Sequence, residues 1–512
     1  MATFLLRSAI VIIVLTMIGR VMGLVRSIFI SHEFGTSFEV GAFYTAFTIP
    51  NLVFLFVPGA INAVFLPSLK KYIIQGKFDE ARALFQKVLT VSLLIYSLFT
   101  AVAWLYADPI IAWMTPGIPV HEQKLAANLL RWMLPSNLFI VLIGLFSSTL
   151  NVHGQFGLPN FGSIVNSLIV IFSIYLFVPL LGIHGLAIGT TLGFAGAALI
   201  MLPALIRKRY SLAPNWQWRD PELKKIGERF LPILLGSLIT SLNEVIEKFL
   251  TSDFGSDKIA ALSYAKQIYQ VPLAVFVGAF AMPIFPLLVE LIKKHAWQEA
   301  KSALEKTLTY MLLLLLPTTA GLWVLGEKIV ALLFQRGQFD AYSTHITTLG
   351  LIFFALGLYP LAVRDILTRA FYALENTVIP VVVGVIQIAA YVLSSLMFAR
   401  YLGFSGVALG WTVGAMVNVL LLGMLLWKKI GRFVGRVYLL SSIKASVATA
   451  GMVAALKGML IVTDDWPLFL EVPAAILLGA MVYGGLLLML KEELTVDVWI
   501  RLLKRLPKGL RL

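Results

Sequence analysis

Apolar runs long enough to cross a lipid bilayer recur along the whole chain, and this feature restricts the fold more than any other. A transmembrane helix needs about 20 consecutive, mainly apolar residues. Because lipid offers no hydrogen-bond partners, a spanning segment must satisfy its own backbone, as an α-helix does. A transmembrane β-barrel would show short segments of alternating polarity, whereas these runs are continuous. The sequence therefore predicts an all-α polytopic membrane protein without a sizeable soluble domain.

Composition agrees with this prediction, because only 13% of the 512 residues are charged, whereas soluble chains carry about 25%. We expect about fourteen transmembrane helices, the first of them retained because no small-residue cleavage site follows it. The expected helices are 8–31, 41–67, 85–107, 129–151, 159–180, 184–206, 230–252, 268–292, 307–326, 346–372, 378–400, 405–427, 440–462 and 468–490.

Several classes of function are excluded by what the sequence lacks. The chain has no cysteine, so it cannot form disulfides, cysteine-bound zinc sites or iron–sulfur clusters. It also lacks Walker A, GxSxG and HExxH motifs, and its six histidines are scattered. We therefore expect a transporter rather than an enzyme, with no cofactor and no bound metal.

The basic residues gather in every second loop. The net charge of +15 comes mainly from these loops, so it predicts topology signals and contacts with anionic membrane lipids, and not nucleic-acid binding. The positive-inside rule then places both termini in the cytoplasm, which an even number of helices also requires. The basic segments are 70–87, 207–229, 293–306, 428–436 and the tail at 504–511.

The chain contains an internal repeat with an offset of about 220 residues. The segment FGTSFEVGAFYTAFTIPNL, from Phe34, is paired with FGSDKIAALSYAKQIYQVPLA, from Phe254, and Pro67 is paired with Pro286. Because each unit holds an even number of helices, the two units should be parallel. Such halves are typical of transporters that bind substrate between them and work by alternating access.

The repeat divides the chain into three parts. We expect a six-helix repeat with its basic connecting loop at 1–228, a second six-helix repeat at 229–430, and two additional helices with a basic cytoplasmic tail at 431–512. Prolines at four positions of the second and eighth helices are expected to interrupt them near the interface between the halves. These are Pro50, Pro58, Pro272 and Pro283.

Charged residues inside the first helix are candidates for substrate binding. Arg20 and Arg26 occur in GRVMGLVR, where Gly19 and Gly23 would allow close helix approach. A charge at the centre of a spanning helix costs about 2.5–3.5 kcal/mol on insertion scales, so it usually faces a cavity or a partner. The planar guanidinium group suits phosphate. The alternative for Arg26 is that it reaches the membrane surface along its aliphatic stem.

A second group of charges occurs in NEVIEKF of the seventh helix. Glu244 and Lys248 have the i,i+4 spacing of a helical ion pair, while Glu247 or Lys248 could instead line a cavity or couple an ion. Lys266 is expected at the membrane interface. In the tenth helix, Arg369 is expected to be a boundary anchor, and Arg364, which lies deeper, is the better candidate for a site.

Longer segments resemble a known family. GRVMGLVRSIFISHEFG, AFYTAFTIPNL, FLPSLKKY, LFQRGQFDAYST and RAFYALENTVIP are similar to the MurJ (MviN-like) lipid II flippases of the multidrug/oligosaccharidyl-lipid/polysaccharide exporter superfamily. The resemblance runs through most of the chain. It implies translocation of the undecaprenyl-diphosphate-linked peptidoglycan precursor from the cytoplasmic to the outer leaflet of the bacterial plasma membrane. Cell-wall synthesis machinery is a further implied partner.

The resemblance also implies a cationic central cavity for the headgroup, with Arg20 and Arg26 at two of the family's arginine positions. Asn51 and Arg364 are further candidates for contacts with the diphosphate or sugar. Gln267 stands where the family has an arginine, so it is grouped with Glu244, Glu247 and Lys248 as a cavity or ion-coupling candidate.

The same comparison shows fewer charges than the family pattern. Ser27 and Gly41 occupy positions where many members have an acidic residue. A flippase for another polyprenyl-linked polysaccharide unit is therefore an alternative. Two further alternatives are a cation-coupled small-molecule exporter and a membrane-embedded glycan polymerase or accessory protein.

Overall fold

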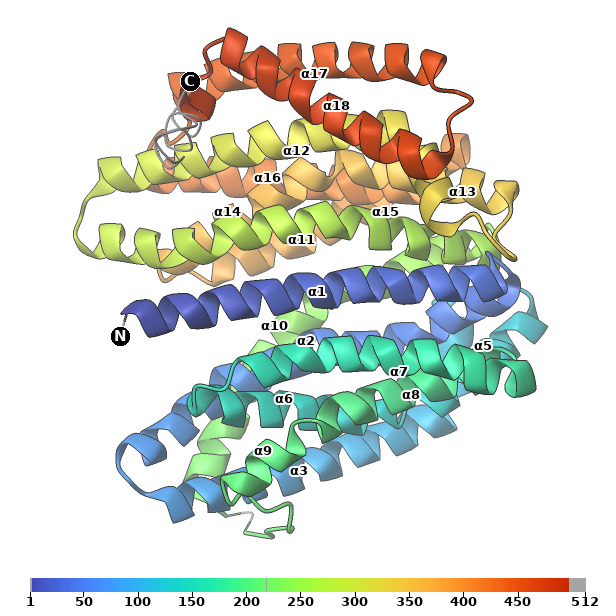
Figure 1. The fold of residues 1–512 in the computed structure, drawn as a ribbon. Coiled ribbons are helices and arrows are strands. Elements are labelled where there is room, and N and C mark those ends of the chain that lie inside the picture. The colour runs from blue at the N-terminus through green and yellow to red at the C-terminus, as the bar shows by residue number, and fades with distance from the viewer. Residues whose placement is uncertain (1, 218, 497–512) are drawn as a thin grey trace, which may run out of the picture. The chain divides into compact units, whose positions relative to one another are not determined.

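The computed structural model describes residues 2–217 and 219–496, and all regular structure in these ranges is helical (Figure 1). The basic tail at 504–511 lies outside the described residues. The N-terminal helices are α1 (Ala2–Phe34), α2 (Phe38–Ile74), α3 (Phe78–Leu105), α4 (Ala107–Met114), α5 (Val120–Met133), α6 (Ser136–Val152), α7 (Gly157–Leu181), α8 (Ile183–Leu199) and α9 (Leu202–Arg207). The others are α10 (Pro221–Ser252), α11 (Ser256–Lys293), α12 (Trp297–Phe334), α13 (Ala341–Leu356), α14 (Leu358–Ala373), α15 (Val378–Leu402), α16 (Ser405–Ile430), α17 (Arg436–Val462) and α18 (Leu468–Met489).

The predicted membrane fold is confirmed. Within the described ranges, eleven helices are long and apolar enough to cross a membrane, and thirteen if each of two bent pairs counts as one span. The bent pairs are α5–α6, with an angle of 42°, and α13–α14, with an angle of 41°. They lie where the sequence predicts the fourth and tenth helices, and α10 lies where it predicts the seventh.

Several helices are longer than predicted, and the predicted interruptions at the prolines are wrong. α2 continues through Pro50, Pro58 and Pro67. α11 likewise runs through Pro272 and Pro283. A proline removes one backbone hydrogen bond, but a packed membrane helix tolerates this loss when neighbouring groups satisfy the freed carbonyl. α3, α11 and α12 also begin 7 to 12 residues before the predicted starts, because amphipathic first turns extend beyond the apolar runs.

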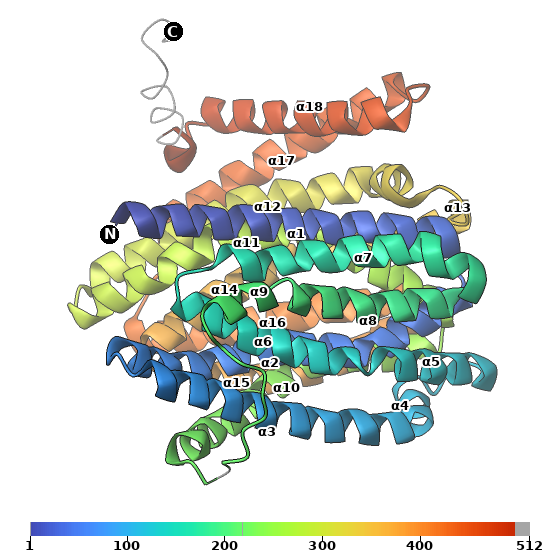
Figure 2. The same ribbon diagram turned by 60° about the horizontal axis from the view of Figure 1, so that its bottom comes forward.

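Contacts divide the chain into two compact units. The first runs to Gln267 and includes Gly337–Phe339, whereas the second contains Ile268–Arg336 and the chain from Asp340 onward. In the first unit, α2 packs against α5, α6 and α10, and α7 packs against both α1 and α8 (Figure 2). In the second unit, α16 packs against α13, α14 and α15, and α12 packs against α17 and α18. The repeats defined by sequence and the units defined by contacts are thus different divisions, because α10 packs on α2.

Backbone conformation shows the duplication independently of sequence similarity. Among the described residues, ten of the twelve with positive φ form pairs separated by about 220 positions. This conformation is rare for residues other than glycine, so its recurrence at matched turns indicates that the two repeats have the same local fold. The pairs are Gly35 and Gly255, Gly76 and His295, Gly154 and Glu375, Gly182 and Gly403, and Arg209 and Gly431.

Close helix packing is repeated in the same way. A Cβ atom on Gly189 of α8 would meet Ser173 of α7, and a Cβ atom on Gly410 of α16 would meet Ser395 of α15. In lipid, helices associate through close packing of small residues rather than through the hydrophobic effect. The α7–α8 and α15–α16 pairs therefore use equivalent small-residue seams.

The additional helices α17 and α18 are attached to α12 near both of its ends. The carboxylate of Glu305 accepts hydrogen bonds from the backbone N–H groups of Gly435 and Tyr438, at 2.8 and 3.1 Å. Towards the other end of α12, Lys328 Nζ lies 2.6 Å from Glu471 Oε1 of α18. These contacts compensate unpaired N–H groups at the start of α17 and the buried carboxylate of Glu471.

Two loops of the first unit pack on helix turns far away in the sequence. The N–H of Gln338 donates to the carbonyl of His32, at 2.9 Å, and Phe339 packs edge-on against Tyr264. At the matched place in the other repeat, the N–H of Gly117 donates to Ser252 Oγ at 3.2 Å. We call these the paired loop–turn contacts. Each joins the α1–α2 or the α10–α11 turn to a loop of the other repeat.

Candidate functional site

The two arginines of α1 have different surroundings. They are six positions apart, which places them about 9 Å apart along the helix axis and about 120° apart around it. Arg26 is half-buried, and its Nη1 donates to Asn166 Oδ1 of α7 at 3.1 Å. Arg20 is exposed and forms no hydrogen bond or ion pair with the described part of the chain. The structure therefore directs Arg26 towards α7 and leaves Arg20 without a protein partner there.

Arg26 belongs to a line of polar contacts between α1 and α7. Thr16 Oγ1 donates to Asn160 Oδ1 at 3.3 Å, and a Cβ atom on Gly19 would meet Ser163 Oγ. The predicted close approach is thus confirmed at Gly19. It is wrong at Gly23, where a Cβ atom would meet nothing within 4 Å. We call the following set the polar seam: Thr16, Gly19 and Arg26 of α1 with Asn160, Ser163 and Asn166 of α7.

The charges of α10 form a compact cluster with α11. Lys266 Nζ lies 2.5 Å from Glu247 Oε2 and 3.2 Å from both carboxylate oxygens of Glu244. Lys248 Nζ lies 3.5 Å from Glu247 Oε1 and donates to Ser263 Oγ at 2.9 Å. Glu247, Lys248 and Lys266 are 1%, 4% and 8% exposed. We call Glu244, Glu247, Lys248 and Lys266 the ion-pair tetrad, in which two carboxylates balance two ammonium groups.

Two predictions about these residues are wrong. The i,i+4 pair of Glu244 and Lys248 is not the one that forms, because Glu244 pairs with Lys266 of α11 and Lys248 pairs with Glu247. Lys266 is not interfacial but buried inside the first unit. A lysine at this depth is held by the two carboxylates that α10 supplies, since a buried charge requires a partner.

The remaining candidates are separate from these two groups. Asn51 of α2 and Gln267 of α11 are half-buried, and neither belongs to the polar seam or the tetrad. Arg364 lies in the second unit, where its Nε and Nη2 donate to Asp365 Oδ1 at 3.2 and 2.9 Å. Its charge is therefore offset by the next residue along the chain. The other predicted site residues all belong to the first unit.

Asn166 was missed from the sequence, and Lys266 was assigned the wrong environment. Asn166 is 8% exposed in α7, a helix that also contains Asn160 and three serines. An asparagine inside a spanning helix was the available signal, because burying it requires a hydrogen-bond partner. Lys266 gave a similar signal within α11, but the sequence could not show which helix would supply its partners.

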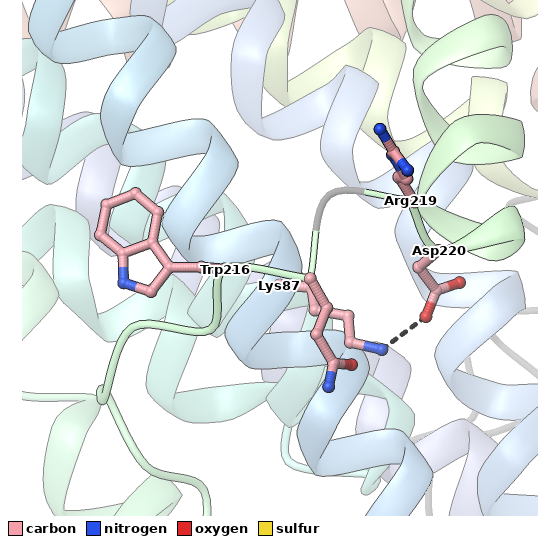
Figure 3. A pocket seen from close by; sticks show the side chains of 5 residues that line it. Lys87, Trp216, Arg219 and Asp220 are labelled. Atoms are coloured by element: carbon pink, nitrogen blue, oxygen red, sulfur yellow. Dashed lines mark hydrogen bonds and ion pairs between the residues drawn. The ribbon is translucent and has the colours of Figure 1, made fainter.

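A cavity of about 510 Å³ lies at the start of α10 and contains none of the predicted site residues (Figure 3). Lys87 Nζ of α3 lies 2.5 Å from Asp220 Oδ2, and Asp220 Oδ1 accepts from the N–H of Glu222 at 2.7 Å. Burial acts to raise the pKa of Asp220, but the bonds from Lys87 and Glu222 outweigh it and hold that pKa below its ordinary value. Asp220 thus caps α10 and fastens the connecting loop to α3. The cavity is lined by Lys87, Trp216, Gln217, Arg219 and Asp220.

Comparison with known families identifies the chain's relatives. Residues 30–476 match the family described as "Lipid II flippase MurJ". The chain belongs to this family. The resemblance inferred from the sequence segments is therefore confirmed, and with it the expectation of a multi-pass inner-membrane transporter.

Individual relatives within the family match over most of their length. The "Probable lipid II flippase MurJ" of Vibrio cholerae serotype O1 is 27% identical over 433 residues, which are 82% of each chain. The protein of the same name from Haemophilus influenzae is 27% identical over 93% of this chain and 98% of its own. A solved structure, "Lipid II flippase MurJ, inward closed conformation", has a TM-score of 0.78 at 22% identity, covering 97% of this chain and 100% of that one. This likeness shows that the fold is shared over 97% of this chain.

Proposed function

We propose that this chain translocates lipid II, the undecaprenyl-diphosphate-linked peptidoglycan precursor, from the cytoplasmic to the outer leaflet by alternating access. The observation that carries the proposal is the family match over residues 30–476, which covers the first repeat from residue 30 onward and the whole of the second. The chain acts in this proposal as a transporter without chemistry of its own. Both termini are cytoplasmic, and the partners are lipid II, the surrounding lipids and the cell-wall synthesis machinery.

The arginines of α1 support a role in holding the diphosphate. Arg26 is bound by a neutral amide, so its positive charge is not offset by that partner. Guanidinium groups form short, charge-assisted hydrogen bonds with phosphate oxygens and remain charged at any physiological pH. Arg20, which lacks a partner among the described residues, offers a second positive group about 9 Å away along the same helix.

The contacts of the ion-pair tetrad support a structural role for its four residues rather than a role in substrate binding. Its two carboxylates and two ammonium groups lie within 3.5 Å of one another in pairs, so they offset each other's charge. A diphosphate is attracted by positive charge that no carboxylate has already balanced. We therefore assign headgroup binding to Arg20 and Arg26, with Asn51 as a neutral hydrogen-bonding candidate, and leave Gln267 and Arg364 as secondary candidates.

The test is complementation of a strain depleted of its lipid II flippase, combined with an assay for lipid II in the outer leaflet. The wild-type chain should restore growth and outer-leaflet lipid II, whereas Arg26→Ala and Arg20→Ala should lose transport while inserting at the wild-type level. Arg131→Ala is the matched control, because Arg131 is paired with Asp108 at 2.5 Å and lies outside the proposed site. This control should retain transport.

The outcomes distinguish the role of Arg26 from the flippase function and from the identity of the cargo. Normal transport by Arg26→Ala would contradict its role in headgroup binding but not the flippase function. Failure of the well-inserted wild-type chain to restore outer-leaflet lipid II would contradict lipid II as the cargo. That result would favour another polyprenyl-linked glycan, in keeping with the neutral residues Ser27, Gly41 and Gln267 at positions where the family pattern is charged.

A further inference from the structure

We propose that Asn166 positions Arg26 for the diphosphate of the substrate and, because its amide is neutral, preserves the positive charge of the guanidinium group. This inference rests on the proposed function. Asn166 acts through Arg26 and is therefore a positioning residue.

The orientation of the Asn166 amide follows from the chemistry of its partner. A guanidinium group has N–H donors and no acceptor, so only the oxygen of the amide can receive its hydrogen bond. Asn166 Oδ1 lies 3.1 Å from Arg26 Nη1 in this orientation. Its Nδ2 then points away from Arg26 and forms no hydrogen bond with the part of the chain that the structure describes.

The amide is held from behind by α8. Asn166 is 8% exposed, and a Cβ atom on Gly193 would lie 2.8 Å from Asn166 Nδ2 and 3.0 Å from the Asn166 carbonyl. Glycine at position 193 therefore leaves just the space that the amide occupies. With α1 on one side and α8 on the other, Asn166 has little freedom to turn, and the direction of Arg26 is fixed by rigid helices.

The neutrality of this partner matters for anion binding. A carboxylate at position 166 would form an ion pair with Arg26 and compete with phosphate oxygens for the same N–H groups. The Asn166 amide accepts one hydrogen bond from Arg26, whereas the guanidinium group has five N–H donors in all. The next residue, Ser27, has a neutral hydroxyl and therefore adds no negative charge beside Arg26. This hydroxyl donates to the carbonyl of Gly23 in the same helix. The structure thus orients Arg26 through a hydrogen bond without neutralising it.

A double-mutant cycle on the purified full-length protein tests this inference. The measured quantity is the affinity for lipid II and for undecaprenyl diphosphate, both in nanodiscs, for the wild type, Asn166→Ala, Arg26→Ala and the double variant. Asn166→Ala should weaken binding of both probes about tenfold, the scale of one lost hydrogen bond to a charged group. In the Arg26→Ala background the same substitution should have no further effect, because its action passes through Arg26.

Asn160→Ala is the matched structural control. Asn160 of α7 bonds to Thr16 of α1, so its replacement also removes an α1–α7 hydrogen bond. It touches neither arginine through that bond. Thermal stability should fall by a similar amount in Asn160→Ala and Asn166→Ala, whereas only the latter should weaken binding of the diphosphate probes.

Asn166→Asp separates positioning from charge. The carboxylate should hold Arg26 in place but offset its charge, so binding should weaken and depend less steeply on salt concentration than in the wild type. The inference is overturned if Asn166→Ala binds both probes as the wild type does. It is equally overturned if Asn166→Ala weakens binding to the same extent with and without Arg26. A wild-type protein that binds neither probe would instead contradict the proposed function itself.

Discussion

Arg20 and Arg26 look alike in the sequence but have different surroundings in the structure. Both could be found from the sequence, because a charge inside an apolar helix is costly and needs an explanation. Their different directions follow from helix geometry alone. The partner of Arg26, however, lies 140 residues away on α7. An asparagine inside a spanning helix indicates a buried hydrogen bond but does not show which helix supplies the partner, so the role of Asn166 could not be assigned.

His153 provides a prediction at the same scale. Its Nε2 lies 3.1 Å from the hydroxyl of Tyr210, and burial, followed by the nearby charge of Lys208, lowers the pKa of His153 below its ordinary value. Burial also raises the pKa of Tyr210 to about 12, so that the hydroxyl keeps its proton for the neutral imidazole. The unfolded chain then binds a proton at His153 more readily than the folded chain does, and the stability from this group is lost as pH falls.

We therefore expect the wild-type protein to lose thermal stability as pH falls through about 6.5, the ordinary histidine pKa. His153→Gln, which can still accept a hydrogen bond from Tyr210 but does not titrate, should show a weaker dependence in that range. The measurement is the unfolding temperature of both proteins in detergent at several pH values between 5 and 8. Identical profiles for the two proteins would show that His153 makes no such contribution.

At the scale of helices, the ion-pair tetrad shows that the sequence predicts the need for charge compensation better than it predicts the partners. The sequence indicated that NEVIEKF required charge compensation inside the membrane, and the structure provides it. The choice of partners was wrong, because the i,i+4 spacing considers only one helix, whereas Lys266 approaches from α11. Helix boundaries were underestimated for a related reason: polar first turns, such as that of α12, do not belong to the apolar run that predicts a span.

Breaking the balance of the tetrad should be costly. Glu247→Gln leaves two ammonium groups beside Glu244 alone, so the free energy of unfolding should fall by about 3–5 kcal/mol, as for other buried ion pairs that lose one partner. The double variant Glu247→Gln with Lys248→Met retains the pair of Glu244 and Lys266 and restores neutrality. It should be more stable than the single variant when both are unfolded by denaturant in detergent. A double variant less stable than Glu247→Gln would indicate that packing, not charge balance, sets the cost.

At the scale of the whole chain, the sequence predicted the duplication, because proline and polar landmarks recur at a constant offset. The matched residues with positive φ show that the duplication also extends to turn conformation. The sequence could not show that Gly337–Phe339 would pack within the first unit. Contacts between a loop and a turn of different repeats leave no periodic pattern, and glycine at positions 35 and 337 is equally compatible with an ordinary turn.

The paired loop–turn contacts predict a specific glycine requirement. Gly337 has φ of 60°, and a Cβ atom there would press against the carbonyl and ring of His32. Gly337→Ala should therefore lower stability by about 1–3 kcal/mol from backbone strain, with a further loss from the clash. Gly76→Ala is the control, because Gly76 has φ of 72° but no atom within 4 Å of the added Cβ. Equal losses of unfolding temperature in the two variants would exclude a contribution from the contact with His32.

The contact between His32 and Gln338 has a consequence for how the protein is made. Gln338 is synthesised about 300 residues after His32, which at 5–20 residues per second is a delay of about 15–60 s. Once the tyrosine at position 264 has been added, the nascent chain contains α1 and α2, but for a further 75 residues it lacks Phe339, which packs against this tyrosine. The first unit is therefore finished only when the ribosome is well into the second repeat. A truncated chain that ends before Gly337 lacks part of its own first unit.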